Sequence, residues 1–298
     1  MDIAVTGSTG FIGTPLVRRL GADGHRVLRL VRPGRGTGSD TAAWDPVAGT
    51  IDSDALDGID AVVHLAGEPI AASRWTTAQK ERILESRRTG TELLAGALAG
   101  LNRPPRTLLS ASAIGIYGDT GDRPTDETGP LGHDFPAEVC RTWERSTASA
   151  SDAGIGVTHL RTGIVLDPGG GALARQLPFF RFGLGGRSGS GHQYQSWISL
   201  RDELAAIAFL LDAELSGPVN LVAPHPVTNA DFARTLGRVL HRPTSVIPMI
   251  GPRLLFGREL ADSLLLTSQR ITPSALQQSG FAFSDPELEP ALRSMLQR

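Results

Sequence analysis

The chain opens with a short apolar run that is followed at once by regularly spaced glycines. Residues 3–5 predict a buried strand, and Gly7, Gly10 and Gly13 follow it at intervals of three residues. From residue 14 to residue 20 the apolar positions recur with helical spacing, which predicts a helix with one buried face. A glycine-rich turn between a buried strand and a helix is typical of a dinucleotide-binding unit.

Strand and helix patterns alternate along much of the remaining chain. Apolar runs predict strands at residues 26–31, 61–67, 107–112, 157–160 and 219–222. Apolar positions at helical spacing predict helices at residues 76–98, 139–150, 202–213 and 228–240. This alternation favours an α/β fold with a doubly wound parallel sheet of Rossmann type.

The pattern becomes irregular after residue 167. Glycine-rich loops are expected at residues 168–171 and 183–191, and a strand at residues 192–200. An earlier loop is expected from Arg32 to Trp44. We expect residues 1–167 to form mainly the cofactor domain, and residues 168–298 mainly a smaller C-terminal α/β substrate cap with a C-terminal extension. We leave open whether some strands and helices of the later part return to the main sheet.

Composition narrows the class of protein. The 298 residues are 40% hydrophobic and 20% charged, and their formal net charge is −2. These values fit a soluble globular protein and give no basic surface for nucleic acid or an anionic membrane. The longest apolar run, residues 204–211, is too short to cross a bilayer. We therefore expect neither a nucleic-acid nor a membrane partner.

Cysteine and histidine content add two expectations. The single cysteine, Cys140, suits a reducing compartment, and a strand that begins at residue 3 leaves no room for a targeting peptide. We therefore expect a cytoplasmic protein, either a monomer or a homodimer. No Cys/His cluster has metal-ligand spacing, so no metal is expected.

The glycine turn is expected to hold a pyrophosphate. One glycine allows the tight turn, the second lets the backbone approach the pyrophosphate, and the third lets helix and strand pack closely. The N–H groups and the dipole at the helix start favour the phosphate charge. The turn residues expected to contact the cofactor are Gly7, Thr9, Gly10, Phe11, Ile12 and Gly13.

The end of the second strand favours NADP(H) over NAD(H). In Rossmann units an acidic side chain near this point binds the ribose 2′-OH of NAD, whereas an arginine accommodates the 2′-phosphate of NADP. Here Arg32 and Arg35 follow the strand, and no acidic residue occurs before Asp40.

Two other polar residues are given structural roles: His64 as a core histidine, and Asp202 in the first turn of its helix.

Several longer motifs strengthen this interpretation. Together with the glycine turn, the chain contains Leu65-Ala66-Gly67-Glu68-Pro69-Ile70, Ser86-Arg87, Ser110-Ala111-Ser112, Tyr117-Gly118, Cys140-Arg141-x-Trp143-Glu144, Leu160-Arg161-Thr162-Gly163-Ile164-Val165, Ser196-Trp197-Ile198 and Gln269-Arg270. With these motifs the chain resembles an atypical extended short-chain dehydrogenase/reductase of the "epimerase family protein" subgroup, which is NAD-dependent epimerase/dehydratase-like and has a C-terminal extension of unknown function.

The resemblance covers essentially the whole chain and implies a Rossmann-type domain, bound NADP(H) and a cap over a small-molecule substrate. It implies no particular substrate. The cofactor-binding positions taken from the motifs are Leu65, Ala66, Gly67, Glu68, Arg87, Ser110, Ala111, Cys140, Thr162, Gly163, Ile164 and Val165.

One feature of the wider superfamily is missing. Its enzymes resemble one another in a Tyr-x-x-x-Lys pair that exchanges a proton with the substrate oxygen. This chain has two tyrosines, neither followed by lysine four residues on, and its only lysine is Lys80. Alignment on the helix places Pro136 and Cys140 where the pair would stand. Another group must therefore act on the substrate oxygen.

Ser112 and Tyr117 are the candidate catalytic residues. Ser112 lies at the carboxyl end of its strand, where the resemblance implies the superfamily's catalytic serine, and Tyr117 follows shortly after it. Arg187, Gln193 and Trp197 are the candidate substrate residues, since polar groups beside an aromatic suit a pocket. Together these features favour an NADP(H)-dependent oxidoreductase on a small carbonyl or alcohol. Two alternatives remain open: a nucleotide-sugar epimerase or dehydratase, and a non-catalytic NADPH-binding sensor.

Overall fold

A sheet of eight strands forms the centre of the protein. The computed structural model describes residues 1–34, 38–213 and 215–296, and the strands run in the order β12-β7-β6-β5-β1-β2-β3-β4. All neighbours pair in parallel except β3 and β4. The strands are β1 (Asp2–Thr6), β2 (Arg26–Val31), β3 (Thr41–Asp45), β4 (Thr50–Ile51), β5 (Ala61–His64), β6 (Thr107–Ala113), β7 (Gly156–Thr162) and β12 (Gly217–Leu221). The expected α/β fold with a mostly parallel, Rossmann-like sheet is confirmed.

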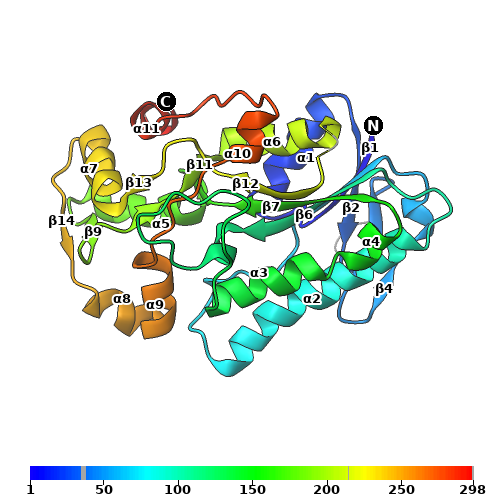
Figure 1. Cartoon of the computed structure of the whole chain (residues 1–298), viewed down its shortest axis with the longest axis horizontal. Coiled ribbons are helices and arrows are strands. Elements are labelled where there is room, and N and C mark those ends of the chain that lie inside the picture. Colours follow the sequence, from blue (N-terminus) through cyan, green and yellow to red (C-terminus); the bar gives the residue numbers. More distant parts are fainter. Residues whose placement is uncertain (35–37, 214, 297–298) are drawn as a thin grey trace.

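Helices cover both faces of this sheet (Figure 1). On one side lie α1 (Gly13–Ala22), α6 (Leu200–Asp212) and α10 (Ser274–Gln278). On the other lie α2 (Thr77–Ala99), α3 (Phe135–Arg145) and α4 (Ala148–Asp152). Strand residues alternate between the two cores: Ile3 and Val5 pack on the first side and Ala4 on the second. Because both faces are buried, the strands read as continuous apolar runs.

A smaller lobe follows β7 and lies at one end of the sheet in Figure 1. We call it the C-terminal lobe. Its core lies among three helices, α5 (Gly171–Arg181), α7 (Asn229–Leu240) and α11 (Leu288–Leu296). Its short strands pair as β8 (Ile164–Asp167) with β11 (Trp197–Ser199), β9 (Gly186–Ser188) with β14 (Ser245–Ile247), and β10 (Tyr194–Gln195) with β13 (Val227–Thr228). Two further helices of this lobe are α8 (Ile250–Phe256) and α9 (Arg258–Leu265).

Two 3-10 turns, η1 (Asp54–Leu56) and η2 (Ile114–Tyr117), lie between strands of the main sheet.

Three elements from the later part of the chain, α6, β12 and α10, join the main sheet or cover it. Strand β12 pairs with β7, with Asn220 opposite Arg161, and α6 packs on the same face as α1. The chain crosses into the C-terminal lobe after β7, returns to the main sheet with α6 and β12, leaves it again, and covers it once more with α10.

Several local expectations were wrong. The loop expected at residues 183–191 contains β9, and the helix expected at residues 139–150 is divided between α3 and α4. The segment from Arg32 to Trp44 is not all loop, because β3 joins the sheet beside β2 with Leu30 opposite Ala42. Its alternating burial, with Ala42 and Trp44 inside, was hidden by the polar residues before it. Residues 192–200 form two strands instead of one, since the chain turns at Ser196 and β10 and β11 join different sheets.

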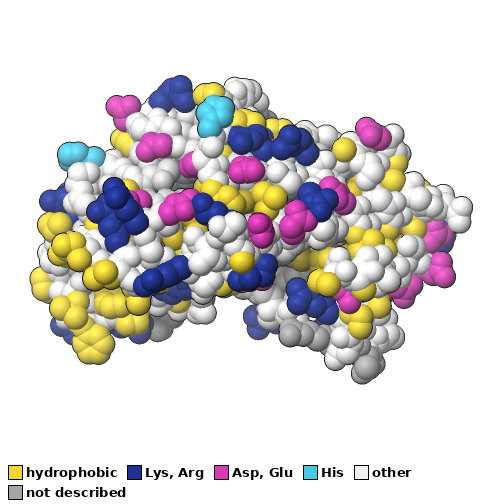
Figure 2. Space-filling model, turned by 90° about the horizontal axis from the view of Figure 1, so that it is seen from below, with side chains coloured by type: hydrophobic (Ala, Val, Ile, Leu, Met, Phe, Trp, Pro, Cys, Tyr) yellow, Lys and Arg dark blue, Asp and Glu magenta, His cyan; other side chains and the backbone are white. Residues whose placement is uncertain are grey.

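The surface of the C-terminal lobe is unusually apolar. Ile250, Leu254 and Leu255 of α8 are all exposed. Figure 2 shows apolar side chains gathered on this lobe, at the left, and a hollow between the lobe and the rest of the molecule, with Lys and Arg side chains on both sides. No helix among the described residues is long and apolar enough to cross a membrane.

Candidate functional site

The glycine turn lies at the carboxyl end of β1, in the middle of the sheet. Gly7 has a φ of +66°, which favours glycine, and its carbonyl accepts a hydrogen bond from the Gly10 N–H at 2.9 Å. A Cβ at Gly13 would lie 2.1 Å from the Gly7 oxygen, and one at Gly7 would lie 2.8 Å from the carbonyl carbon of Leu65. Side chains are therefore excluded at both positions. No side chain caps the start of α1. Thr14 donates its N–H to Gly10 O at 3.0 Å and Pro15 has no N–H, so an anion there would meet the Gly13 N–H and the positive end of the helix dipole.

Phe11 links the turn to the C-terminal lobe. A Cβ at Gly170 would lie 2.3 Å from its ring, and one at Gly171 would lie 3.0 Å from it. Thr9 is exposed, and Phe11 and Ile12 are half-buried. Through Phe11, the turn therefore packs closely against Gly170 and Gly171 of the C-terminal lobe.

Arg32 follows β2 on one side of the turn and is exposed. The acidic residue that could have bound a 2′-OH, Asp40, accepts a hydrogen bond from Arg29 Nε at 3.1 Å and pairs with its guanidinium. Arg32 therefore remains the charged group at the end of β2 among the described residues. Arg35 lies outside the described residues.

The end of β5 is joined to the turn through a single hydroxyl. Thr6 Oγ1 accepts hydrogen bonds from the N–H groups of Leu65 and Ala66, at 3.1 and 3.2 Å. It lies 2.7 Å from His64 Nδ1, while Nε2 lies 2.9 Å from Thr91 Oγ1. Burial lowers the pKa of His64 to about 4, with Arg87 acting in the same direction. His64 is thus a neutral core histidine, as expected.

Arg87 and Cys140 lie where α2 and α3 approach the ends of β5 and β6. Arg87 is buried and donates to the backbone oxygens of Glu68 and Ile83, at 2.9 and 3.1 Å. The neighbouring Ser110 hydroxyl, on β6, is buried without a hydrogen-bond partner among the described residues, and Ala111 follows it. Burial raises the pKa of the Cys140 thiol to about 11, so the thiol is neutral at neutral pH.

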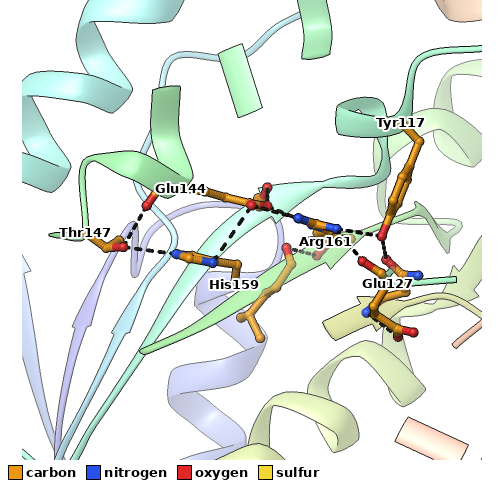
Figure 3. Close-up of polar contacts among 10 residues, drawn as sticks. Tyr117, Glu127, Glu144, Thr147, His159 and Arg161 are labelled. Atoms are coloured by element: carbon orange, nitrogen blue, oxygen red, sulfur yellow. Dashed lines mark hydrogen bonds and ion pairs between the residues drawn. The ribbon is translucent and has the colours of Figure 1, made fainter. Parts of the chain in front are cut away.

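The two candidate catalytic hydroxyls belong to one network around Arg161. Figure 3 shows Tyr117, Arg161 and Glu144 of this network. Ser112 Oγ donates to Glu144 Oε1 at 2.7 Å. Arg161, opposite Ser112 on β7, binds both oxygens of Glu144 and donates from Nη1 to the Tyr117 hydroxyl at 2.8 Å. The structure therefore joins Ser112 and Tyr117 through the Arg161–Glu144 ion pair.

Tyr117 is held more tightly than Ser112. Its hydroxyl accepts from Arg161 and donates to Asn220 Oδ1 at 2.7 Å, so its one proton is in use. Burial raises the pKa of Tyr117 to about 12, although Arg161 acts the other way. At neutral pH the phenol therefore keeps its proton and directs it toward Asn220.

A buried acid of α6, Glu203, lies against the end of β7, and the sequence interpretation missed it. Thr162 Oγ1 donates to Glu203 Oε1 at 2.9 Å, and Glu203 Oε2 is buried without a partner among the described residues. Burial raises the pKa of Glu203 to about 8. The only sequence signal is an acidic residue directly before the apolar run of α6. Its neighbour Asp202, also buried, accepts from the N–H groups of Ser284 and Asp285.

Gly163 follows β7 in a tight crossing. A Cβ there would lie 2.7 Å from the Ser196 carbonyl oxygen, and the next residues, Ile164 and Val165, begin β8. This crossing is where the chain leaves the main sheet, so the predicted cofactor positions 162–165 lie at the boundary of the two lobes.

The three candidate substrate residues make contacts within the C-terminal lobe. Arg187 donates to the carbonyls of Gly189 and Ser190, and Gln193 donates to those of Ser188 and Leu265. Trp197 is buried in the lobe core and donates to His225 O at 3.2 Å. Their contact with a substrate stays a prediction.

Asn220 and Glu127 also belong to the site, and nothing in the local sequence marked them. Glu127 Oε1 accepts from the N–H groups of Asn220 and Ala275, and its backbone oxygen accepts from Arg161 at 3.3 Å.

No group of three metal-ligating side chains occurs among the described residues.

Comparison with known proteins agrees with this architecture. Residues 3–163 match the NAD dependent epimerase/dehydratase family, and residues 247–295 match a Domain of unknown function (DUF1731). The chain belongs to the NAD dependent epimerase/dehydratase family and carries the C-terminal extension that the motifs implied.

Several relatives cover the whole chain. It is 46% identical over 292 residues to Epimerase family protein Mb2239 of Mycobacterium bovis, covering 97% of this chain and 96% of that protein. A structure of human epimerase family protein SDR39U1 (isoform2) with NADPH superposes with a TM-score of 0.91 and 34% identity over 100% of both chains. A nucleoside-diphosphate sugar epimerase from Corynebacterium glutamicum superposes with a TM-score of 0.81 and 39% identity, over 99% of this chain and 58% of that one.

Proposed function

We propose that this protein is an NADP(H)-dependent oxidoreductase that acts on a small carbonyl or alcohol without a Tyr-x-x-x-Lys pair. The observation that carries the proposal is the row of features along one sheet edge. Arg32, the glycine turn and Gly67 follow the adjacent strands β2, β1 and β5, and Ser112 lies one residue before the end of the next strand, β6. In parallel α/β sheets a dinucleotide binds across the carboxyl ends of the strands.

The residues present fit NADP(H). The turn excludes side chains at Gly7 and Gly13, and the Gly13 N–H and the positive end of the α1 dipole are suited to a pyrophosphate. Arg32 supplies a charge for the 2′-phosphate, because Asp40 is paired with Arg29. The human relative was crystallised with NADPH, which is consistent with this choice. When bound, the cofactor would supply or accept a hydride.

We assign the substrate oxygen to Ser112 in preference to Tyr117. The Ser112 hydroxyl donates to Glu144, has the Cys140 thiol close by, and can turn its O–H toward a carbonyl oxygen. The Glu144 carboxylate then stays compensated by Arg161, so the rotation leaves no unpaired charge. A hydrogen bond from Ser112 would polarise the carbonyl, and water would provide the proton.

A second candidate function is a non-catalytic NADPH sensor. The observation that favours it is the Tyr117 hydroxyl, which is fully used by Arg161 and Asn220. An epimerase or dehydratase also needs a base for the sugar hydroxyl, so the missing pair counts against the activity that several relatives' names suggest.

The experiment is NADPH oxidation across a panel of small aldehydes and ketones. On any substrate that reacts, Ser112→Ala should lower kcat by about a hundredfold, as loss of a group that polarises the reacting oxygen does. Ser149→Ala, on the exposed face of α4, is the matched control and should leave kcat unchanged. An unchanged rate in Ser112→Ala would remove Ser112 from the mechanism. A silent panel with tight NADPH binding would favour the sensor.

A further inference from the structure

His159 is a titratable side chain beside the Ser112 network that the mechanism above does not use. It lies on β7, and its side chain is 17% exposed. Figure 3 shows its ring between Thr147 and Glu144. Nε2 lies 3.0 Å from Thr147 Oγ1, and Nδ1 lies 3.9 Å from Glu144 Oε2. The ring therefore faces the carboxylate that holds Ser112, at the oxygen that Ser112 does not use.

The hydrogen bonds of Thr147 decide which ring nitrogen carries the proton. Thr147 Oγ1 donates its only proton to the Glu144 backbone oxygen at 2.7 Å, so it can only accept from His159. Nε2 is therefore the protonated nitrogen of the neutral ring, and Nδ1 directs a lone pair toward the Glu144 carboxylate. A second proton can enter only at Nδ1, where it would replace this repulsion with an ion pair.

Two residues supply the charge around His159. Glu144 on α3 favours the imidazolium, whereas Arg161, two residues further along β7, opposes it. Burial has the largest effect and lowers the pKa of His159 below its ordinary value of 6.5. The ring is therefore mostly neutral at neutral pH and gains its proton at lower pH. Among the described residues the other packed elements add no charge at the ring: the opposing strand residues are Ser110 and Pro218, and the acid of α4, Asp152, is exposed.

Glu144 connects this proton to the Ser112 hydroxyl. Its Oε1 accepts from Ser112 at 2.7 Å and from Arg161 Nε, and its Oε2 accepts from Arg161 Nη2. These donors share the single charge of one carboxylate, so an additional charged N–H at Oε2 weakens the hold on the Ser112 hydroxyl. Protonation of His159 and release of the Ser112 hydroxyl are therefore linked, and each favours the other.

We propose that His159 is a positioning residue for Ser112: protonation at Nδ1 draws the Glu144 carboxylate toward the ring and frees the Ser112 O–H for the substrate oxygen. This inference rests on the function proposed above. His159 acts here through Glu144 and need not touch the substrate. The cofactor still supplies the hydride and water the proton, so His159 changes the orientation of Ser112 and not the balance of the reaction. Carbonyl reduction should therefore become faster as the pH falls through the pKa of His159.

The test measures the proton affinity of His159 without cofactor or substrate, by NMR titration of the histidine side chains, with His159→Gln identifying its signals. The neutral ring should carry its proton on Nε2. Ser112→Ala should raise the proton affinity by about twofold to tenfold, the range of one hydrogen bond, because Glu144 loses a donor. Ser149→Ala, on the exposed face of α4, is the matched control and should leave it unchanged. An unchanged affinity in Ser112→Ala, or a neutral ring protonated on Nδ1, would overturn the inference.

Kinetics on any substrate that reacts provide a second test. In the wild type kcat should rise as the pH falls through the pKa of His159, and His159→Gln should remove this rise. His225→Gln is the matched control, because His225 is an exposed histidine that also faces a carboxylate, that of Glu287, and the rise should persist there. A rise that persists in His159→Gln would overturn the inference. A silent panel would contradict the proposed function, whereas the NMR titration needs no substrate and still decides whether His159 and Ser112 are linked.

Discussion

Arg161 and Glu144 form a two-bond ion pair inside the protein, with Nε donating to Oε1 and Nη2 to Oε2, each at 2.9 Å. Their side chains are only 6% and 12% exposed. Planar guanidinium and carboxylate groups match in this geometry. Ser112 and Tyr117 attach to opposite ends of the pair, so the pair sets the positions of both hydroxyls.

We predict that Glu144→Gln lowers the free energy of unfolding by about 3–5 kcal/mol, the usual cost of leaving one partner of a buried pair uncompensated. Urea denaturation monitored by circular dichroism measures the change. Glu85→Gln breaks an exposed pair with Arg88 and should cost about 1 kcal/mol or less. Equal losses in the two variants would show that the interior pair is hydrated in solution.

The glycine turn predicts a separation of folding from binding. A Cβ at Gly10 would lie 3.1 Å from the Gly7 oxygen, which is tight but tolerable, whereas a branched side chain would fill the space of a pyrophosphate. Gly10→Val should therefore fold and lose NADPH binding. Thermal unfolding with and without NADPH measures both effects, because a ligand that binds only the folded state raises the Tm.

Gly96→Ala is the control for that variant. Gly96 lies inside α2, and no atom lies within 4 Å of the position its Cβ would take. Alanine there should raise stability by about 0.5–1 kcal/mol without changing the NADPH-induced shift. A normal shift in Gly10→Val would mean that the phosphate binds elsewhere.

The fold was predictable wherever the signal is local. The strand, turn and helix around Gly7 and Gly13 lie within one short stretch, and steric conflict leaves no side chain at either position. Strand β3 was missed, because its two inward residues, Ala42 and Trp44, follow a polar segment that is typical of a loop.

The candidate site was predictable only in part, because its partners are distant in sequence. Ser112 lies near the end of β6 and Tyr117 follows that strand, yet the carboxylate that binds Ser112 comes from Glu144 on α3. The group that accepts the Tyr117 proton is Asn220, 103 residues further on, at the strand that returns to the sheet. The apolar pattern of β12 does not show that Asn220 will lie beside Tyr117, which follows β6.

Glu203 predicts a pH dependence of stability. Burial raises its pKa to about 8 from an ordinary value of 4.5, so the folded protein keeps a proton that the unfolded chain releases. Stability is then lost as the pH rises between these two values, by up to about 1.4 kcal/mol per pH unit. Burial lowers the pKa of His64 from 6.5 to about 4. His64 therefore makes stability rise with pH, but only below pH 6.5.

Above pH 6.5 the change of stability with pH therefore reports on Glu203 and not on His64. Urea unfolding should show that wild-type stability falls between pH 6.5 and pH 8, and that Glu203→Gln flattens this fall. Glu81→Gln, an exposed change on α2, should keep the wild-type slope. The same slope in Glu203→Gln as in the wild type would show that the carboxyl is ionised in the folded protein.

The most direct test of the central claim is calorimetric titration of NADPH and NADH into the wild type and Arg32→Ala. A charge-assisted contact to the 2′-phosphate predicts that the wild type binds NADPH about tenfold to a hundredfold more tightly than NADH, and that Arg32→Ala removes most of this preference. Arg26→Ala, at the opposite end of β2, should retain it. Equal affinities of the wild type for the two cofactors, or no binding of either, would contradict the account.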